Sequence, residues 1–504
     1  MNRQSLLINT KAILFLFVLL LSLSACDSLK QLQSTTDDNN TSQSDDGELD
    51  AIEGKRVYNP ETGAYEVVKD VTGDMEDVVW QEEENSAPPI SSEATDLIES
   101  GQTLPNTEGA GDYEENEDLL PTYNMVLALP FLANQVNSYD TKIDTRALIA
   151  LNFYEGAKLA FDVLSTEAIN LDVQVLDTRA SETETRSLTY RNELSQAHVI
   201  IGTFKNSNTK VVADFAQQSK IPFVSPYYPH NNLVDTNKYF IQLNPSIKMH
   251  CEAVMQHIKS RYSADQIILV GRETRQEQGI MNLYQQAHFQ LAGSSSVPPL
   301  KVLSINDQTA SLENTKIKEH FLEGKKTVFI VASSNEGFAY SLLRKMDIAK
   351  KNRDEENDDI GLEDNELVVY GQPRWKDFTK ISYDYYEKLN LHISSESFLD
   401  PNSFEVKSFK QNFYNNYGTV PTEQAFIGYD TVLYFGRMLK QYGPSFYNKL
   451  DQNYKDMLHT RFTINRVVTK PRTTGMENLN QFDQYENTFV NILEFKDYQF
   501  QRIN

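Results

Sequence analysis

Short apolar segments of strand length alternate with longer amphipathic segments over residues 123–371, and this alternation constrains the fold more than any other feature of the chain. In the longer segments apolar residues recur every three or four positions, the period of a helix with one buried side. Parallel strands need long crossover connections, which helices usually provide, so the pattern predicts parallel sheets flanked by helices. We expect strands at 123–131, 171–176, 198–202, 222–225, 239–243, 266–271, 301–305, 327–332 and 366–371.

The expected helices lie between these strands and continue beyond the last of them. They are predicted at 145–164, 182–194, 210–218, 249–262, 276–291, 312–321, 336–349, 405–417 and 422–441. The pattern restarts near residue 239 and produces two α/β units of similar size, which indicates two lobes. The acidic stretch 352–364 is predicted to be a solvated loop, with an interaction patch as the alternative. Residues 489–495 and 498–500 are predicted to form a hairpin that turns at Lys496 and Asp497.

The first 26 residues have the pattern of an export signal. Arg3 and Lys11 precede the apolar run 12–23, which is too short to span a bilayer comfortably. The sequence Leu-Ser-Ala-Cys at 23–26 resembles a bacterial lipobox, in which cleavage leaves Cys26 as the first mature residue with diacylglycerol on its thiol. We expect a signal peptide over 1–25 and anchoring in the lipid bilayer through Cys26; an ordinary signal anchor with an incidental cysteine is the alternative.

The negative charge of the chain is concentrated after this signal. Residues 27–120 contain 26 acidic and 4 basic side chains, whereas residues 121–504 contain 45 and 41. The acidic segment has no sustained helix or strand period, so we expect a disordered tether over 26–120. The body is nearly neutral and has no basic stripe, which excludes nucleic acid as a partner.

One part of the acidic segment has a different composition. Valine and tyrosine alternate on both sides of the turn sequence Asn-Pro-Glu-Thr-Gly at 59–63, which predicts a small hairpin over 56–68. The apolar residues between Tyr58 and Trp80 can serve as a short motif that docks on a partner or on the body by strand addition. The alternative is an apolar part of a linker that has no specific partner.

Neither catalytic nor metal-binding spacing is present in the sequence. There is no G-x-S-x-G elbow, no phosphate loop, and no HExxH or C-x-x-C pair. Cys251 is the only cysteine after Cys26, so an internal disulfide is excluded, and we expect its side chain to be a buried apolar group. We therefore expect no enzyme activity, no catalytic residue, no cofactor and no metal site.

The order of elements over 121–504 resembles the type I periplasmic-binding-protein fold of leucine-type solute receptors. The resemblance rests on the strand that ends in Ala-Leu-Pro-Phe at 128–131, the helix segment 154–160, Ile-Ile-Gly at 200–202 before a Ser/Asn/Thr turn, Pro-Phe-Val-Ser-Pro at 222–226, and the helix segment 425–429 before Asp430. It implies a two-lobed α/β body in which each lobe is a parallel sheet flanked by helices. Lobe one would comprise about 121–246 and 400–464, and lobe two about 247–399 and 465–504.

In that family a ligand lies between the lobes, held by turns at the carboxyl ends of strands, where helix N-termini and unpaired amides are available. Carried over by position, the resemblance implies ligand-binding residues in both lobes: Asn206, Ser207, Thr209, Ser225, Tyr227, Tyr228, Arg272, Gln276, Ser334, Asn335 and Arg374. For Ser207, Thr209 and Asn335, a helix cap or turn residue is an equally good interpretation.

The sequence departs from the amino-acid receptors at their acidic positions, which neutralise the ammonium group of the ligand. The nearest positions read Ile247-Lys248 and Gln-Pro-Arg at 372–374. An unpaired buried ammonium is costly, so we expect a small polar ligand, anionic or neutral, rather than a zwitterionic amino acid. Arg272, Arg374 and Lys248 favour the anion.

Two functions follow from the resemblance. The first is a lipid-anchored solute receptor of the amino-acid or branched-chain type, which would deliver its ligand to an ABC transporter permease. The second is a non-transport lipoprotein that regulates a cell-wall enzyme, because bacterial lipoproteins that stimulate penicillin-binding proteins share this fold. In both cases the expected location is the bacterial cell envelope, facing the periplasm, on the outer membrane.

Overall fold

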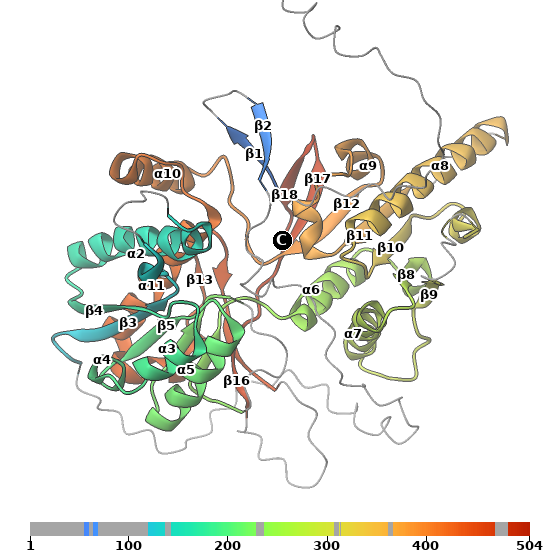
Figure 1. The fold of residues 1–504 in the computed structure, drawn as a ribbon. Coiled ribbons are helices and arrows are strands. Elements are labelled where there is room, and N and C mark those ends of the chain that lie inside the picture. The colour runs from blue at the N-terminus through green and yellow to red at the C-terminus, as the bar shows by residue number, and fades with distance from the viewer. Residues whose placement is uncertain are drawn as a thin grey trace, which may run out of the picture. The chain divides into compact units, whose positions relative to one another are not determined.

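The structure, a computed structural model, describes residues 119–136, 143–227, 236–306, 312, 314–360, 366–468 and 482–504, and the backbone of β1 (Lys55–Asn59) and β2 (Ala64–Val68) (Figure 1). Strands β1 and β2 pair antiparallel with Tyr58 opposite Tyr65, which confirms the hairpin predicted around the Asn-Pro-Glu-Thr-Gly turn. The signal peptide 1–25, Cys26 and the rest of the tether up to residue 118 lie outside the described residues.

The first of two large sheets has seven strands in the order β15-β16-β7-β6-β5-β3-β4. All neighbouring pairs in this sheet are parallel except β15 with β16. The central strands are apolar on both faces because helices flank the sheet, and every residue of β5 is buried. The strands are β3 (Tyr123–Leu129), β4 (Leu171–Asp177), β5 (Val199–Gly202), β6 (Phe223–Ser225), β7 (Phe240–Gln242), β15 (Ile464–Val467) and β16 (Gln484–Asn487).

The second sheet also has seven strands, in the order β18-β17-β12-β11-β10-β8-β9. Strands β8 to β12 run parallel, and the hairpin β17–β18 adds two antiparallel strands at one edge. Asp497 and Tyr498 adopt φ angles of 54° and 61° in the turn of this hairpin, close to its predicted position. The strands are β8 (Ile267–Arg272), β9 (Lys301–Ile305), β10 (Thr327–Val331), β11 (Leu367–Gly371), β12 (Leu391–Ser395), β17 (Asn491–Lys496) and β18 (Gln499–Arg502).

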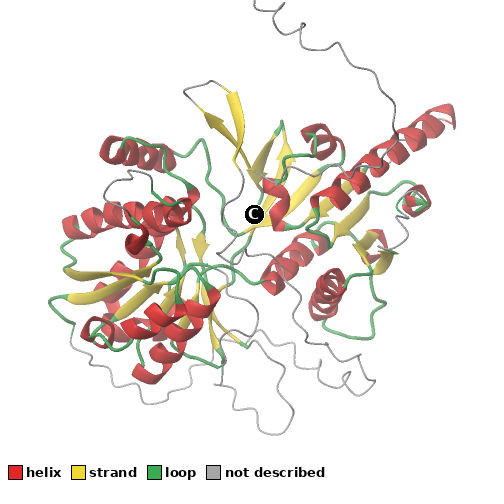
Figure 2. Cartoon of the chain, viewed as in Figure 1, coloured by secondary structure: helices red, strands yellow, loops and turns green. Residues whose placement is uncertain are grey.

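Helices flank the strands of both sheets (Figure 2), so the chain has the two-lobed α/β architecture expected from the sequence. Those of the first lobe are η2 (Ala133–Gln135), η3 (Thr145–Ala147), α2 (Leu148–Thr166), α3 (Glu182–Leu188), α4 (Asn192–Ser195), α5 (Asn206–Ser219), α10 (Phe404–Tyr417), α11 (Glu423–Tyr442) and η7 (Gly443–Gln452). Those of the second are α6 (Ile247–Lys259), η4 (Ala264–Gln266), α7 (Arg275–Ala292), η5 (Ile317–His320), α8 (Glu336–Ile360), η6 (Pro373–Asp377) and α9 (Tyr383–Lys388). None of the described helices is long and apolar enough to cross a membrane.

Helices α2 and α11 pack against each other through glycines, beside the first sheet. A Cβ atom on Gly156 would lie 1.8 Å from the carbonyl oxygen of Ala425, and one on Gly428 would lie 2.0 Å from that of Phe153. The two backbones therefore approach more closely than any larger side chain allows. Both helices contribute to the core cluster that contains Phe153, Val432 and Phe435.

Several predicted boundaries differ from the structure. Strands β15 and β16 belong to the first sheet, although we assigned everything after residue 464 to lobe two. The segment 312–321 contains only the short helix η5 among its described residues, not the predicted helix. The predicted helix 182–194 is two shorter helices, α3 and α4. The structure also contains strand β12, helix α9 and the two-stranded sheet of β13 (Lys455–Asp456) and β14 (Arg461–Phe462), none of which we predicted.

The loop predicted at 352–364 is wrong over most of its length, because α8 continues to Ile360. Ion pairs one turn apart support this extension: Lys350 lies 2.7 Å from Asp354, and Lys351 lies 2.9 Å from Asp347. Such pairs stabilise a helix that has little apolar surface to bury. The alternation of basic and acidic side chains along this stretch indicates a helix, whereas its net acidity alone does not.

Candidate functional site

Ser225 ends β6, a central strand of the first sheet, and Tyr227 follows two residues later. Both residues thus lie at the carboxyl end of a strand, as the sequence predicted. The Ser225 hydroxyl donates to the carbonyl oxygen of Tyr227 at 3.0 Å, which shapes the turn. The Tyr227 ring packs edge to face on Phe204 with 4.3 Å between ring centroids, and its hydroxyl is buried without a hydrogen-bond partner among the described residues. Burial and the negative charge of Glu423 raise the pKa of this hydroxyl. Tyr228 lies outside the described residues.

The polar turn predicted at 206–209 is the first turn of α5. Asn206 and Ser207 are half-buried at its start, while Asn208 and Thr209 are fully buried. The Thr209 hydroxyl lies 2.8 Å from that of Thr203 and donates to the carbonyl oxygen of Lys205 at 3.1 Å. Thr209 therefore has a local structural role, whereas Asn206 and Ser207 lie at a helix N-terminus, where backbone amides are available.

Arg272 ends β8 of the second sheet, but α7 supplies its partner. The Arg272 side chain lies 2.7 Å from the Glu277 carboxylate, which also accepts from the backbone amide of Arg272 at 2.6 Å. The Glu277 side chain is 3% exposed, so this pair is largely withdrawn from solvent. The Arg272 guanidinium also lies over the ring of Phe338 at 5.4 Å. The cation expected to attract an anion is thus already neutralised; Gln276 lies beside the pair and is half-buried.

The loop after β10 carries the next predicted residues. Asn335 accepts from the backbone amide of Phe338 at 2.8 Å, so it caps α8, in line with the alternative interpretation. Ser334 is half-buried, and its hydroxyl oxygen is buried without a hydrogen-bond partner among the described residues. Arg374, which follows β11, is exposed.

A charged cluster that we did not predict lies at the ends of β11 and β12. The Lys376 ammonium group lies 3.0 Å from a carboxylate oxygen of Glu396 and 3.8 Å from one of Glu423. Glu396 directly follows β12, whereas Glu423 is the first residue of α11 in the other lobe. The Ser397 hydroxyl donates to Glu423. The three charged side chains are 19%, 31% and 37% exposed respectively, so the cluster is half-buried.

The pKa values of the cluster reflect these contacts. Burial alone would raise the pKa of Glu396, but the positive charge of Lys376 outweighs it and holds the pKa at about 2. Burial alone would lower the pKa of Lys376, but Glu396 and Glu423 raise it instead. Burial lowers the pKa of His250 in α6 to about 4, so this side chain is neutral at pH 7.

Trp375 positions Lys376. It is fully buried, and its indole nitrogen donates to the carbonyl oxygen of Ser333 at 2.8 Å. Its ring lies against Gly371, where an added Cβ atom would come within 2.4 Å of the ring. The hydroxyl of Tyr386 donates to the carbonyl oxygen of Trp375 at 3.2 Å. Lys376 therefore projects from a short helix that a buried tryptophan fixes on both sides.

A second acidic side chain missed in the sequence lies at the first crossover between lobes. Glu486 of β16 is 3% exposed and accepts from the backbone amide of Ser246 at 2.6 Å. Burial raises its pKa. The sequence has no acidic side chain at 247–248, and in the structure Glu486 reaches this crossover from a strand 240 residues after Ser246. Glu486 and Glu396 are thus both bonded to other groups of the chain.

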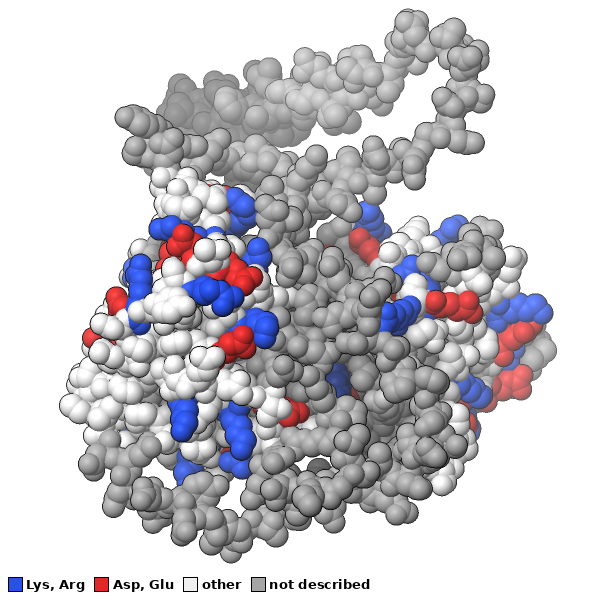
Figure 3. Space-filling model, turned by 60° about the horizontal axis from the view of Figure 1, so that its bottom comes forward, with Lys and Arg blue, Asp and Glu red and all other residues white. Residues whose placement is uncertain are grey.

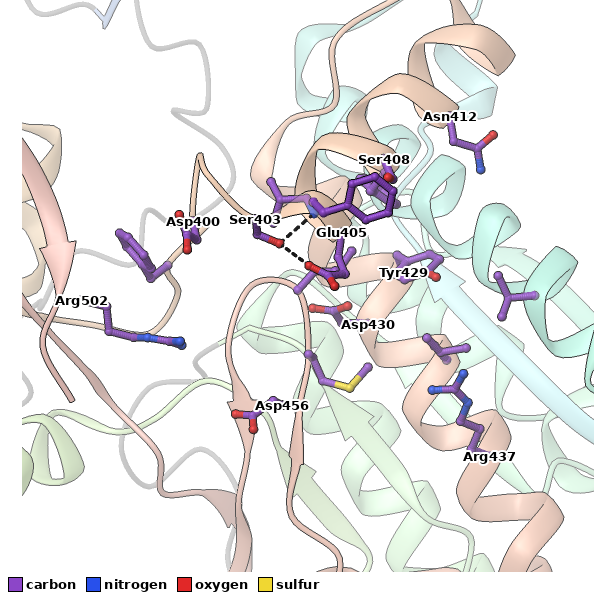
Figure 4. A pocket seen from close by; sticks show the side chains of 18 residues that line it. Asp400, Ser403, Glu405, Ser408, Asn412, Tyr429, Asp430, Arg437, Asp456 and Arg502 are labelled. Atoms are coloured by element: carbon purple, nitrogen blue, oxygen red, sulfur yellow. Dashed lines mark hydrogen bonds between the residues drawn. The ribbon is translucent and has the colours of Figure 1, made fainter.

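A separate pocket of about 730 Å³ lies between α10, α11 and β13, and Arg502 of β18 in the second sheet also lines it (Figure 4). None of the predicted ligand residues lines it. Ser403 caps α10 and donates to Glu405, and Asp430 lies nearby on α11. Asp430 is fully buried and accepts from the backbone amide and the ring of His459 at 2.9 and 2.5 Å, so it anchors the connection to β14.

Charges elsewhere on the surface are mixed. Figure 3 shows lysine and arginine beside aspartate and glutamate on the described part of one face, in accord with the nearly balanced composition of the body. Among the described residues, no group of three or more His, Cys, Asp or Glu side chains is placed to hold a metal ion. Cys251 is buried, as expected.

Comparison with known proteins is consistent with this geometry. Residues 155–357 match the sequence profile of the family described as "Receptor family ligand binding region". A putative branched-chain amino acid ABC transporter protein from Rhodospirillum rubrum matches with a TM-score of 0.53 and 14% identity, over 76% of this chain and 100% of that one. The chain therefore has a type I periplasmic-binding-protein-like fold. At this identity the match supports the periplasmic-binding-protein fold alone.

Two further structural matches have TM-scores below 0.5, and we base no argument on them. They are an ABC transporter substrate-binding protein from Desulfitobacterium hafniense in complex with Leu (TM-score 0.44, 14% identity, 76% of this chain and 100% of that one) and LpoA from Haemophilus influenzae (TM-score 0.48, 13% identity, 76% and 59%). No curated protein sequence matches the chain.

Proposed function

We propose that this chain is a lipid-anchored solute-binding protein of the bacterial envelope that binds a small polar ligand between its lobes and has no enzyme activity. The observation that carries the proposal is the set of polar groups that meets at the strand ends of both lobes, with Tyr227 and Glu423 from the first and Lys376 and Glu396 from the second. Unpaired buried groups such as the Tyr227 hydroxyl are costly unless a partner completes them. A ligand would supply that partner.

Thermal shift with a panel of metabolites tests this proposal. A ligand present at about 100 times its dissociation constant should stabilise the body by about 2.7 kcal/mol. We expect anionic or neutral polar molecules to shift the melting temperature more than leucine does. Tight binding of leucine would contradict the anion preference, and a panel without any effect would contradict the solute-binding function.

The Tyr227→Phe substitution provides a matched test of the site. It removes only the buried hydroxyl, so we expect a loss of affinity of about tenfold for the identified ligand, the effect of about one hydrogen bond. Tyr190→Phe is the control, because Tyr190 is 84% exposed in the first lobe. If both variants bound the ligand with equal affinity, the ligand would not contact the Tyr227 hydroxyl at the carboxyl end of β6.

One observation favours a second candidate, a lipoprotein that regulates a partner such as a peptidoglycan synthase. The cations at the strand ends already have carboxylate partners in the chain, Arg272 with Glu277 and Lys376 with Glu396. A receptor that must bind an anion would usually leave such a cation free. A body that ignores the metabolite panel but changes the rate of a purified peptidoglycan synthase would support the second candidate.

A further inference from the structure

Lys376 has the surroundings of a bound ammonium ligand. Its ammonium group has three N–H donors, and three acceptors lie near them: Glu396 at 3.0 Å, Ser395 at 3.5 Å and Glu423 at 3.8 Å. The ammonium group thus has one short hydrogen bond to Glu396, a long one to the Ser395 hydroxyl and an ion pair with Glu423. The lysine side chain is 19% exposed, so most of it is removed from water.

Two of the three acceptors, Ser395 and Glu423, also bond to groups other than the lysine. Ser397 donates to Glu423, and its carbonyl oxygen accepts from the Ser395 hydroxyl at 2.7 Å. Asn491 of β17 donates to the carbonyl oxygen of Ser395 at 3.2 Å. The crossover that contains Glu396 is thus fixed independently, and the site for a cation would remain if the lysine were shortened.

The contact also joins the lobes. Lys376 and Glu396 follow strands of the second sheet, whereas Glu423 begins α11, which packs on α2 of the first lobe. In a solute receptor the ligand makes this connection, because polar groups of both lobes bond to it. Here a side chain of the protein makes it.

We propose that Lys376 acts as an internal ammonium group that occupies the position a cationic group of a solute would take between Glu396 and Glu423. The wild-type chain therefore excludes ammonium-bearing solutes from this position and connects its lobes without them. The consequence for solute choice rests on the proposed function, whereas the occupancy by Lys376 does not. Lys376 is a specificity-determining residue in this account.

Chemical rescue tests the occupancy. In Lys376→Ala the two carboxylates lose their cation and repel each other, so the melting temperature should fall. Added n-propylammonium chloride should restore at least half of the loss in a saturable manner, because its three carbons and its charge match the part of the lysine side chain beyond Cβ that the substitution removes. Sodium chloride at equal ionic strength should restore much less, and the wild-type protein should not respond to the amine.

Two controls locate the effect. Lys380→Ala removes an exposed lysine just after the same short helix and should show no rescue. Lys376→Ala combined with Glu396→Gln should lose the response to the amine, because one acceptor is neutral. Rescue that is equal for sodium and propylammonium, or equal in the double variant, would overturn the proposal.

A second variant covers the case in which Lys376→Ala does not fold. Lys376→Met keeps the volume without the charge, and the pKa of Glu396 should then rise from its low value, as measured by carboxyl carbon NMR. An unchanged pKa would overturn the proposal. Rescue by the amine together with a metabolite panel that has no effect would support the role of Lys376 and count against the solute-binding function, so the two proposals fail separately.

Discussion

At the scale of single residues, burial and nearby charges determine the pKa values of the ionisable side chains. His250 is 4% exposed and lies close enough to Glu396 and Lys376 to be affected by both charges. Burial is the largest influence and lowers its pKa to about 4. His257 lies two turns further along α6. Burial lowers its pKa to about 4 as well, and the positive charge of Arg261 lowers it further. Both side chains stay neutral in the folded state at mildly acidic pH.

We expect the free energy of unfolding to fall as the pH drops from about 6.5 to about 4, because the unfolded chain binds protons at these histidines before the folded protein does. Glu396 also loses its contribution to stability on acidification, but because its charged form is stabilised in the folded protein. Its pKa of about 2 is below the ordinary 4.5, so its stabilisation is present above pH 4.5 and lost between 4.5 and 2.

Urea denaturation across this pH range checks the histidine effect. In His250→Gln the slope between pH 6.5 and 4 should decrease relative to that of the unsubstituted protein. An unchanged slope in His250→Gln would show that His250 titrates normally in the folded protein.

At the scale of elements, close approach of backbones sets the packing. The contact of α2 with α11 depends on Gly156 and Gly428, and the position of η6 depends on Gly371, whose missing Cβ makes room for Trp375. Through Trp375 the same glycine places Lys376 between its two carboxylates. Packing inside the lobes and the geometry of the site are thus connected by small residues.

We expect Gly428→Ala to destabilise the body by at least about 1–3 kcal/mol, the usual cost of overpacking, because the new Cβ would collide with the carbonyl oxygen of Phe153 at 2.0 Å. Gly279→Ala in α7 is the matched control. A Cβ atom added to Gly279 would have no other atom within 4 Å, so this substitution should stabilise the helix by about 1 kcal/mol. Denaturant titrations compare the two variants, and a neutral Gly428→Ala would mean that α2 and α11 can separate at little cost.

At the scale of the whole molecule, most of the net negative charge and the folded lobes lie in different parts of the chain. Residues 27–120 contain 26 acidic and 4 basic side chains, whereas the body is almost neutral. The body has its own core clusters in both lobes, built from residues after 120. Folding of the lobes should therefore not depend on the acidic segment.

We expect deletion of residues 27–118 to leave the melting temperature of the body nearly unchanged while it removes most of the net charge. Differential scanning calorimetry of the two proteins measures this. A large loss of stability would mean that the hairpin β1–β2 or its flanking residues pack on the body.

The anchor belongs to the same scale. We expect Cys26→Ala to accumulate as an uncleaved or unlipidated precursor, because the thiol is the atom that accepts the lipid. Mass spectrometry of the protein from membranes would show this, and unchanged lipidation in the variant would place the anchor elsewhere. Cys251 cannot substitute for Cys26, because it is buried.

The sequence by itself determined the two-lobed α/β fold and most of its elements. Periodicity depends on local spacing, so strands such as β5 and β10 and helices such as α11 could be predicted within a few residues. It also predicted that Ser225 and Tyr227 lie at the carboxyl end of a strand, and β6 ends at Ser225. It failed for α8, where ion pairs rather than apolar residues continue the helix, and for β15 and β16, whose sheet could not be known from local pattern.

Only the tertiary structure decided which charges meet. Lys376, Glu396 and Glu423 come from three separate elements, and Arg272 has its partner in the helix that follows it. The sequence predicts that Arg272 favours an anion, but the structure pairs it with Glu277, and it brings Glu486 of β16 to Ser246 and Glu396 to Lys376. The physical reason is that charge pairing depends on distances of a few ångströms between residues that are far apart along the chain, and such distances exist only once the sheets have formed.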